Sequence, residues 1–424
     1  MGDVIEGPPI LPPELVAEIL CKLPVKSLLR FTSVCKTWLS MIRNDHHFAI
    51  KHYLVRTTSS SHVLDDVDYM FDSTRTASHY KPCLYSFTAA KTFRYLYRFE
   101  CVPDMTINVS NSRHGVICFS LMLTSQALLC NPSIQEAVLL PPSPNKGHPV
   151  LGFDHISNDY KVVTINWKNI CTINVYSVRQ GYWRNLHVSG SLQCVSELNG
   201  CGVSNANGRM CNWLFSKKLE STRTKATGWL SFDMVEEVLK ELPMPECRIH
   251  KIHEHNHLSS SRWQGCISCL PHTWDIKSKF VDVWVLKGGG TINRSEDWMW
   301  KKVFAVKFPG HDPMWPSNFW LNDKELFVNI GGIDNEEVFH YNLNSQQLRR
   351  TGRKGSIGGW KKGYAGSLVS IKHLMSPKHG EGEGKGKQQN VGEDEDSKPD
   401  DNGGFIFRVV GRRGVRWFHS FKSI

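Results

Sequence analysis

The sequence predicts a multidomain α + β protein, with a small N-terminal module of three helices followed by an all-β, propeller-like domain of about six blades. Two observations predict this fold class. Near the start of the chain, from Leu11 to Ile42, apolar residues recur at helical spacing. From about residue 80 onward, short runs rich in Val, Ile, Leu, Phe, Tyr and Trp are separated by Gly, Asn, Asp, Ser and Pro, which is typical of strands and turns.

The first predicted helix opens with two prolines, where a missing backbone N–H costs no hydrogen bond. Apolar residues then recur at spacings of three and four, which places them on one stripe of a helix. These residues are Leu15, Ile19, Leu20 and Leu23. Pro24 ends the helix, because a proline cannot continue the backbone hydrogen-bond ladder.

Two further short helices are predicted, from Val25 to Phe31 and from Ser33 to Ile42. Their apolar sides carry Leu28, Leu29, Phe31, Val34, Trp38 and Ile42. A free unit of roughly forty residues is near the lower limit for a self-sufficient hydrophobic core. We therefore expect the surplus apolar surface to need a partner. On periodicity alone, the same stripe also fits an ordinary helical cap packed on the rest of the chain.

The order of residues from Leu11 to Trp38, LPPELVAEILCKLPVKSLLRFTSVCKTW, resembles the F-box, the adaptor-binding module of substrate receptors in cullin-RING ubiquitin ligases. The run LPVKSLLRF followed by VCKTW is similar to the plant version, with departures at Ser33 and at Asp45-His46. The resemblance implies an F-box over residues 8–52 that binds a Skp-family adaptor and, through it, a cullin. The adaptor-binding residues that it implies are Leu11, Pro12, Leu15, Ile19, Leu20, Leu23, Pro24, Leu28, Leu29, Phe31, Val34, Cys35 and Trp38.

A unit of strand, polar turn and strand recurs through the large domain. Its copies begin at Cys83, Ala127, Ile173, Trp229, Val281 and Val338. Successive copies are displaced by roughly forty-five to fifty-five residues, the spacing of four-stranded propeller blades, so six copies predict about six blades. Each unit leaves an apolar face that only its neighbours can cover. We expect four tryptophans of these hairpins to pack between sheets: Trp183, Trp213, Trp229 and Trp300.

The region from Arg113 to Ile371 resembles the F-box-associated interaction domain of plants, a relative of kelch-like propellers. The likeness is carried by runs such as CNPSIQEAVLLPPSP at Cys130, LGFDHISNDYKVV at Leu151 and GYAGSLVSI at Gly363. The resemblance implies a substrate-binding domain over residues 80–375. It transfers no ligand residues and leaves the substrate-binding residues unknown.

Composition limits the possible partners and compartments. The net charge of +11 suits an acidic or nucleic-acid partner, but no nucleic-acid-binding signature accompanies it, so a nucleic-acid partner is disfavoured. No run of eighteen apolar residues and no secretion signal is present, so we expect no membrane or export route and a cytoplasmic and/or nuclear location. The thirteen cysteines lack the spacing of a disulfide framework and are expected to be reduced thiols.

The sequence contains no recognisable catalytic motif, and we expect a non-catalytic receptor without a cofactor. The densest group of potential metal ligands lies between Cys247 and Cys269. Cys266 and Cys269 would point to opposite faces of one strand, so we expect no bound metal. Two other functions stay open: a propeller that binds proteins without a ligase and, more distantly, an enzyme on the same scaffold.

The last part of the chain divides into a linker and a tail. Residues 376–404 contain almost no apolar side chain and are expected to form a disordered acidic, Gly-rich linker. Residues 405–424 mix aromatic residues with arginines, and this composition fits a hairpin or a basic amphipathic element without deciding between them. The basic stretch from Arg349 to Lys362 is either a docking patch for an acidic partner or a solvated loop.

Overall fold

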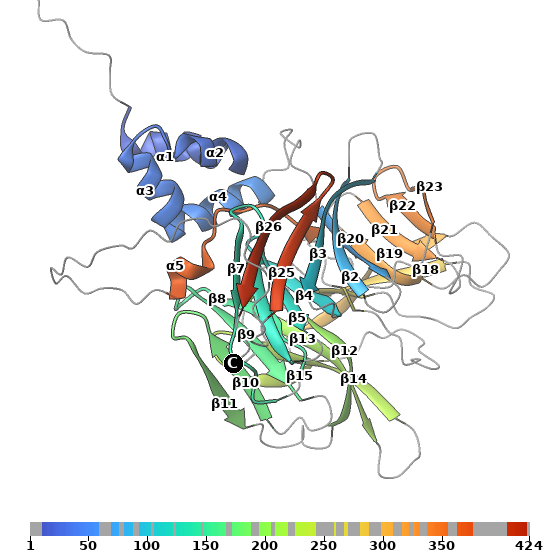
Figure 1. Cartoon of the computed structure of the whole chain (residues 1–424). Helices are drawn as coiled ribbons and strands as arrows, with labels where there is room; N and C mark the ends of the chain where they lie inside the picture. The colour runs from blue at the N-terminus through green and yellow to red at the C-terminus, as the bar shows by residue number, and fades with distance from the viewer. Residues whose placement is uncertain are drawn as a thin grey trace, which may run out of the picture.

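The structure is a computed structural model (Figure 1). It describes residues 11–58, 69–75, 80–87, 93–102, 106–121, 124–145, 147–166, 172–187, 195–204, 208–218, 225–242, 258–259, 267–269, 280–287, 298–307, 316–321, 325–330, 337–354, 363–375 and 405–421. Helices lie at the N-terminus, and antiparallel sheets make up most of the remaining described residues. The predicted linker at 376–404 falls outside the described residues, as do most of the candidate metal ligands.

The N-terminal module has helices in the three predicted places. These are α1 (Pro13–Cys21), α2 (Val25–Phe31) and α3 (Lys36–Asn44). Pro12 and Pro24 precede the first two helices, and the Cys35 sulfur caps α3 by accepting a hydrogen bond from the Trp38 backbone N–H at 3.5 Å. The prolines thus set where the helices begin.

A fourth helix, α4 (His46–Thr58), was not predicted from the sequence. It begins after Asp45, whose carboxylate accepts a hydrogen bond from the Phe48 backbone N–H at 3.0 Å, as an N-cap does. Its buried side chains are Phe48, Ala49, His52 and Tyr53, a spacing that places them on one face. The helix was missed because two of these four residues are His and Tyr, which weakens the apolar pattern.

The strands form six antiparallel sheets within the described residues. The first sheet has the order β24 (Gly363–Tyr364), β1 (Tyr69–Arg75), β2 (Tyr80–Phe87), β3 (Phe93–Val102), β25 (Phe405–Gly411) and β26 (Gly414–Phe421). The second sheet contains β4 (Ile107–Arg113), β5 (Val116–Leu121), β6 (Gln126–Asn131) and β7 (Glu136–Leu139). The third contains β8 (Val150–Asp154), β9 (Asp159–Ile165), β10 (Thr172–Ser177) and β11 (Tyr182–His187).

The remaining three sheets also have four strands each, in chain order. The fourth contains β12 (Val195–Ser204), β13 (Met210–Lys218), β14 (Lys225–Asp233) and β15 (Leu239–Leu242). The fifth contains β16 (Leu258–Ser259), β17 (Ile267–Cys269), β18 (Phe280–Lys287) and β19 (Met299–Lys307). The sixth contains β20 (Pro316–Leu321), β21 (Glu325–Ile330), β22 (Glu337–Asn342) and β23 (Gln347–Lys354). Successive sheets touch in chain order, through β2 with β4, β4 with β8, β8 with β12, β12 with β16 and β16 with β20.

Four hairpins share one kind of turn, and three of them are copies of the predicted repeat. Side-chain oxygens of Asn131, Asp154, Asp233 and Asn342 each accept a hydrogen bond from the backbone N–H two residues further on. The fifth residue of each turn is left-handed, with φ between 53° and 57°, at Gln135, Asn158, Glu237 and Gln346. The same turn chemistry thus closes hairpins in four different sheets.

The end of the chain belongs to the β domain. Residues 405–421 form the hairpin of β25 and β26, and β25 pairs with β3 in the first sheet. Phe407 lies 5.7 Å, ring centre to ring centre, from Phe119 of the second sheet. The domain therefore extends past residue 375, where the sequence places its end, and β1 lies before residue 80, where the sequence places its start.

The tryptophans of the hairpins pack as expected where the structure describes them. Trp213, Trp229 and Trp300 are buried, and the rings of Trp229 and Trp300 lie 5.4 Å apart between the fourth and fifth sheets. Trp183 is only partly buried, with its indole N–H donating to the Pro141 carbonyl at 3.0 Å. The seven cysteines whose side chains the structure describes are all free thiols.

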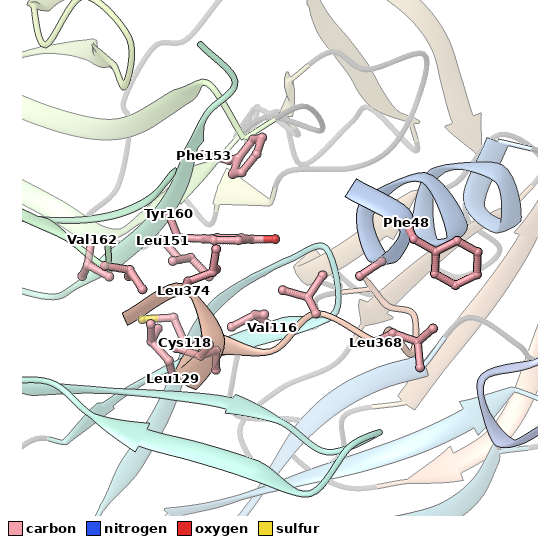
Figure 2. Close-up of a cluster of buried hydrophobic side chains, with 14 of the residues drawn as sticks. Phe48, Val116, Cys118, Leu129, Leu151, Phe153, Tyr160, Val162, Leu368 and Leu374 are labelled. Carbon is pink, nitrogen blue, oxygen red and sulfur yellow. The ribbon is translucent and has the colours of Figure 1, made fainter. Parts of the chain in front are cut away.

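One hydrophobic core joins the helices to the β domain (Figure 2). It combines helical side chains with strands of the second and third sheets and with α5 (Ile371–Met375). Its members include Leu20, Leu28, Ile42, Phe48, Val116, Leu151, Tyr160, Val369 and Leu374. Because the core is continuous, the helical module is held against the sheets by packing.

Candidate adaptor-binding surface

The first helix presents a stripe of exposed apolar side chains. Leu15 and Ile19 lie four residues apart on α1, Leu11 lies just ahead of the helix, and each keeps about half of its surface accessible, at 51%, 51% and 54%. Residues four apart lie on the same face of a helix. The shared core covers the other side of this helix, at Leu20 and Cys21. Much of the predicted apolar surface on α1 is therefore left uncovered by the rest of the described chain.

A second exposed group lies where α2 leads into α3. Val34 is 58% exposed and Leu39 is 43% exposed, and Cys35 is also exposed. Leu39 was not among the predicted site residues. Sequence alone could not identify Leu39, because it is next to Trp38 in the helical pattern. Only the structure shows that Leu39 is the more exposed of the two.

Five predicted residues are partly buried and support these exposed groups: Leu23, Pro24, Leu29, Phe31 and Trp38. The rings of Phe31 and Trp38 lie 5.6 Å apart, which ties α2 to α3. Each of the five retains some accessible surface, so a partner could cover more of it. Pro12 is exposed ahead of α1.

Two predicted residues do not reach the surface. Leu20 is 1% exposed and Leu28 is 0% exposed, and both belong to the shared core. Periodicity placed them on the apolar stripe but could not divide that stripe between an internal and an external partner. In this structure they hold the helices in place beneath the exposed residues.

Two polar side chains of α4 contact α1 and the residues just after it. The Lys51 ammonium lies 2.5 Å from the Glu18 carboxylate, and a ring nitrogen of His52 lies 2.8 Å from the Leu23 carbonyl oxygen. The hydrogen bond and charge of Lys51 lower the pKa of Glu18. The Glu18 pair is exposed and adds little stability. The His52 side chain is buried, and its contact holds the backbone just after α1.

The junction between α4 and the sheets is aromatic and closely packed. The Tyr53 and His114 rings meet edge to face at 5.5 Å, and His114 and Phe153 do so at 4.7 Å. The Nδ1 atom of His114 lies 2.8 Å from the Tyr160 hydroxyl oxygen. His114 is left-handed, with φ 46°, at the turn between β4 and β5.

His46 is a partly buried titratable group at the same junction. Its ring lies 6.1 Å from that of Tyr160, and its Nε2 atom has no hydrogen-bond partner among the described residues. Burial, together with the neighbouring charges of His47 and Arg179, lowers the pKa of His46 to about 4. The imidazole is therefore neutral at physiological pH.

Two family models match the chain. The F-box domain matches residues 9–49, and the F-box associated beta propeller domain matches residues 68–371, more than half of the chain. The chain belongs to the F-box associated beta propeller domain family. The predicted resemblance is thus confirmed for the F-box and for the associated domain, and the exposed stripe described above lies within the F-box.

Similar proteins carry the F-box in their names. An F-box/kelch-repeat protein of Arabidopsis thaliana is 28% identical over 329 residues, which are 74% of this chain and 84% of that protein. An F-box/WD-40 repeat-containing protein of the same plant is 24% identical over 71% of this chain and 70% of its own length. Among solved structures, a nidogen/laminin complex matches 70% of this chain and 98% of its own chain, with 10% identity and a TM-score of 0.39.

Other candidate sites gave no comparable geometry. In the part of the chain that the structure describes, no group of three or more His, Cys, Asp or Glu side chains is placed to hold a metal ion. No helix there is long and apolar enough to cross a membrane. Of the basic stretch predicted at 349–362, Arg349 and Arg350 are exposed on β23, and residues 355–362 lie outside the described residues.

Proposed function

We propose that the protein is the substrate-recognition subunit of an SCF-type cullin-RING ubiquitin ligase. The F-box would bind a Skp-family adaptor and, through it, a cullin, while the β domain would bind a protein substrate for ubiquitination and degradation. The chain itself would perform no bond chemistry and would act by raising the local concentration of the substrate beside the ligase. We infer a closed six-bladed ring for the β domain, and a cytoplasmic and/or nuclear location.

The observation that carries this proposal is the exposed apolar stripe of Leu11, Leu15 and Ile19 within an F-box. Burying the exposed halves of these three side chains in a partner would stabilise the complex by about 25 cal/mol per Å² of apolar surface removed from water. Exposed apolar clusters on a soluble protein mark interaction sites. A helical cap that served only its own β domain would have no need for this stripe.

The shared core supports a geometric role for the protein. Phe48 and Ala49 of α4 pack with Val116 and Leu151 of the sheets, so the adaptor-binding helices and the β domain share side-chain contacts. A bound substrate would therefore be held at a defined distance from the adaptor. This arrangement suits a receptor that presents a substrate to a transfer site on another subunit.

Co-purification with a Skp-family adaptor tests the proposal. We expect the full chain to retain the adaptor and the double variant Leu15→Asp/Ile19→Asp to lose it, because two charges would face an apolar partner. Both positions are half exposed, so the variant should fold. Ile156→Asp is the matched control, since Ile156 is 73% exposed in a turn of the third sheet.

The experiment also separates the proposal from its main alternative. A β-domain protein that works without a ligase would fail to retain any adaptor although it is folded. Retention of the adaptor by the Leu15→Asp/Ile19→Asp variant would show that the adaptor does not bind at α1. Charged substitutions of Leu28 would be uninformative, because that side chain is fully buried and its loss would disrupt the core.

A further inference from the structure

The outer strand of the first sheet has an unusual surface. Among the described strands β26 pairs with β25 alone, so it forms an edge of the sheet as described. One face of the strand carries Trp417 and Phe421, which pack against the core between the first and second sheets. On this strand Phe418 is 62% exposed and Val415 is 54% exposed. An edge strand of this kind leaves backbone N–H and C=O groups available for a further strand.

The charged residues of the β25–β26 hairpin itself are all basic. Arg412, Arg413 and Arg416 are exposed at the turn of the hairpin and at the start of β26. No Asp or Glu occurs between residues 405 and 424. Charged residues on an edge discourage pairing between copies of the same protein, since like charges repel. The same arginines would attract an acidic segment of another protein.

Other outer strands with exposed apolar residues differ from β26. On β11, Tyr182 is 50% exposed, but the nearby Arg184 is paired with Glu237 at 2.6 Å. On β19, Met299 is 69% exposed and is the one large apolar side chain so exposed on that strand among those described. β26 alone among the described outer strands combines two large exposed apolar residues with unneutralised arginines. Protection of the edge accounts for the arginines but not for an exposed Phe and Val.

We propose that β26 binds an extended acidic segment of a protein substrate as an added β-strand, an inference that rests on the substrate-receptor function proposed above. Backbone hydrogen bonds to the free edge would supply the pairing. Phe418 and Val415 would contact apolar side chains of the segment, and the three arginines would contact its carboxylates. β26 runs over eight residues, so it accommodates a segment of similar length.

The probe is a fluorescein-labelled ten-residue peptide of alternating glutamate and valine, and the measurement is its fluorescence anisotropy with the full chain. We expect Phe418→Glu to weaken binding about tenfold or more, and the double variant Arg412→Gln/Arg413→Gln to do the same. Binding should also weaken as salt is raised, because the arginines are exposed. A matched peptide of alternating lysine and valine should not bind.

Two control variants carry the same chemical changes elsewhere. Met299→Glu matches Phe418→Glu, and Lys301→Gln/Arg349→Gln matches the arginine pair, since all three residues are exposed on other outer strands. Both controls should bind the peptide within about twofold of the wild type. If they weaken binding as much as the β26 variants do, the effect is one of net charge and the proposed surface is wrong.

Backbone methylation of the peptide tests strand addition itself. Alternate N–H groups of an added strand point towards the partner strand. We compare one probe methylated at every valine nitrogen with another methylated at every glutamate nitrogen. At least one of the two should no longer bind, because its methyl groups would block the N–H groups that face β26. Unchanged binding of both, tighter binding of a ten-nucleotide uridine oligonucleotide, or no binding of the original peptide would each overturn the proposal.

Adaptor co-purification is measured on the same variants. Phe418→Glu should retain the adaptor, because β26 lies outside the F-box. Loss of peptide binding with the adaptor retained assigns the peptide site to β26 and leaves the ligase role intact. If the wild type retains the adaptor but does not bind the peptide, the β26 proposal is wrong and the proposed ligase role is unaffected.

Discussion

His46 shows how a single partly buried side chain makes the structure sensitive to acid. In the unfolded chain an imidazole has a pKa of about 6.5, whereas burial lowers the pKa of His46 to about 4. Between these values the unfolded state binds more protons, so the free energy of unfolding falls as the pH drops from about 6.5 to 4. We expect a loss of about 2 kcal/mol from this residue over that range.

Melting temperatures at pH 7.5 and 5.0 would measure the effect. The two melting temperatures should differ less in His46→Gln than in the wild type, because the variant lacks one titrating group. The pKa values of His52, His148 and His419 are also lowered by burial, so some of the difference should stay. His47→Gln is the control, since His47 is exposed on the same helix. An identical pH dependence in wild type and His46→Gln would contradict this account.

Tyr160 contributes a single hydroxyl to the junction between α4 and the sheets. Its oxygen lies 2.8 Å from Nδ1 of His114, and both side chains are buried. Tyr160→Phe removes this hydrogen bond without changing the packed ring, so we expect the free energy of unfolding to fall by about 1–2 kcal/mol. Chemical denaturation would measure the change. Tyr182→Phe, at an exposed position, should leave the free energy of unfolding nearly unaltered. An equal loss in the two variants would show that the Tyr160 hydrogen bond does not stabilise the junction.

At the scale of elements, the cap of α4 stabilises a helix that contributes to the shared core. Asp45 accepts the Phe48 N–H at the start of this helix, and Phe48 lies in the shared core. Asp45→Ala should lower the free energy of unfolding by about 1 kcal/mol, as the loss of an N-cap does. Lys51→Ala breaks only an exposed ion pair and should cost less in the same denaturation experiment. The reverse order would contradict the assigned cap.

The C-terminal hairpin is a second element whose packing is testable. Phe407 is 0% exposed and lies against Phe99 and Phe119, at ring separations of 6.1 Å and 5.7 Å. Phe407→Ala should lower the free energy of unfolding by about 3–5 kcal/mol. Phe418→Ala, on the adjacent strand but exposed, should have little effect on thermal melting. Similar melting temperatures for the two variants would show that the hairpin is not part of the core.

These elements also show what sequence alone could and could not predict. The helix starts at Pro13 and Val25 and the repeated turns were predictable, because each depends on residues within a few positions of one another. The place of residues 405–421 was not, since β25 pairs with β3 some 300 positions earlier in the chain. For the same reason, periodicity placed Leu15 and Leu20 on one stripe but could not show that only Leu15 is exposed.

At the scale of the whole molecule, the F-box and the β domain form one packed body within the described residues, with α4 between them. Over residues 11–58 the F-box side carries seven Lys and Arg against three Asp and Glu. The charged residues of α1 itself, however, are the acidic Glu14 and Glu18, so the positive charge lies elsewhere in the F-box. Apolar contact would supply most of the affinity for an adaptor, and charge would mainly affect how fast the two proteins associate.

Hydrogen exchange of the full chain with and without a Skp-family adaptor is the most direct test of the central claim. The adaptor should slow exchange in peptides that cover residues 11–21 and 34–43, which carry the exposed apolar residues Leu15, Ile19, Val34 and Leu39. Peptides from β5, β6 and β26 should exchange as before. Slower exchange confined to the β domain, or none in α1, would show that the stripe is not where the adaptor binds.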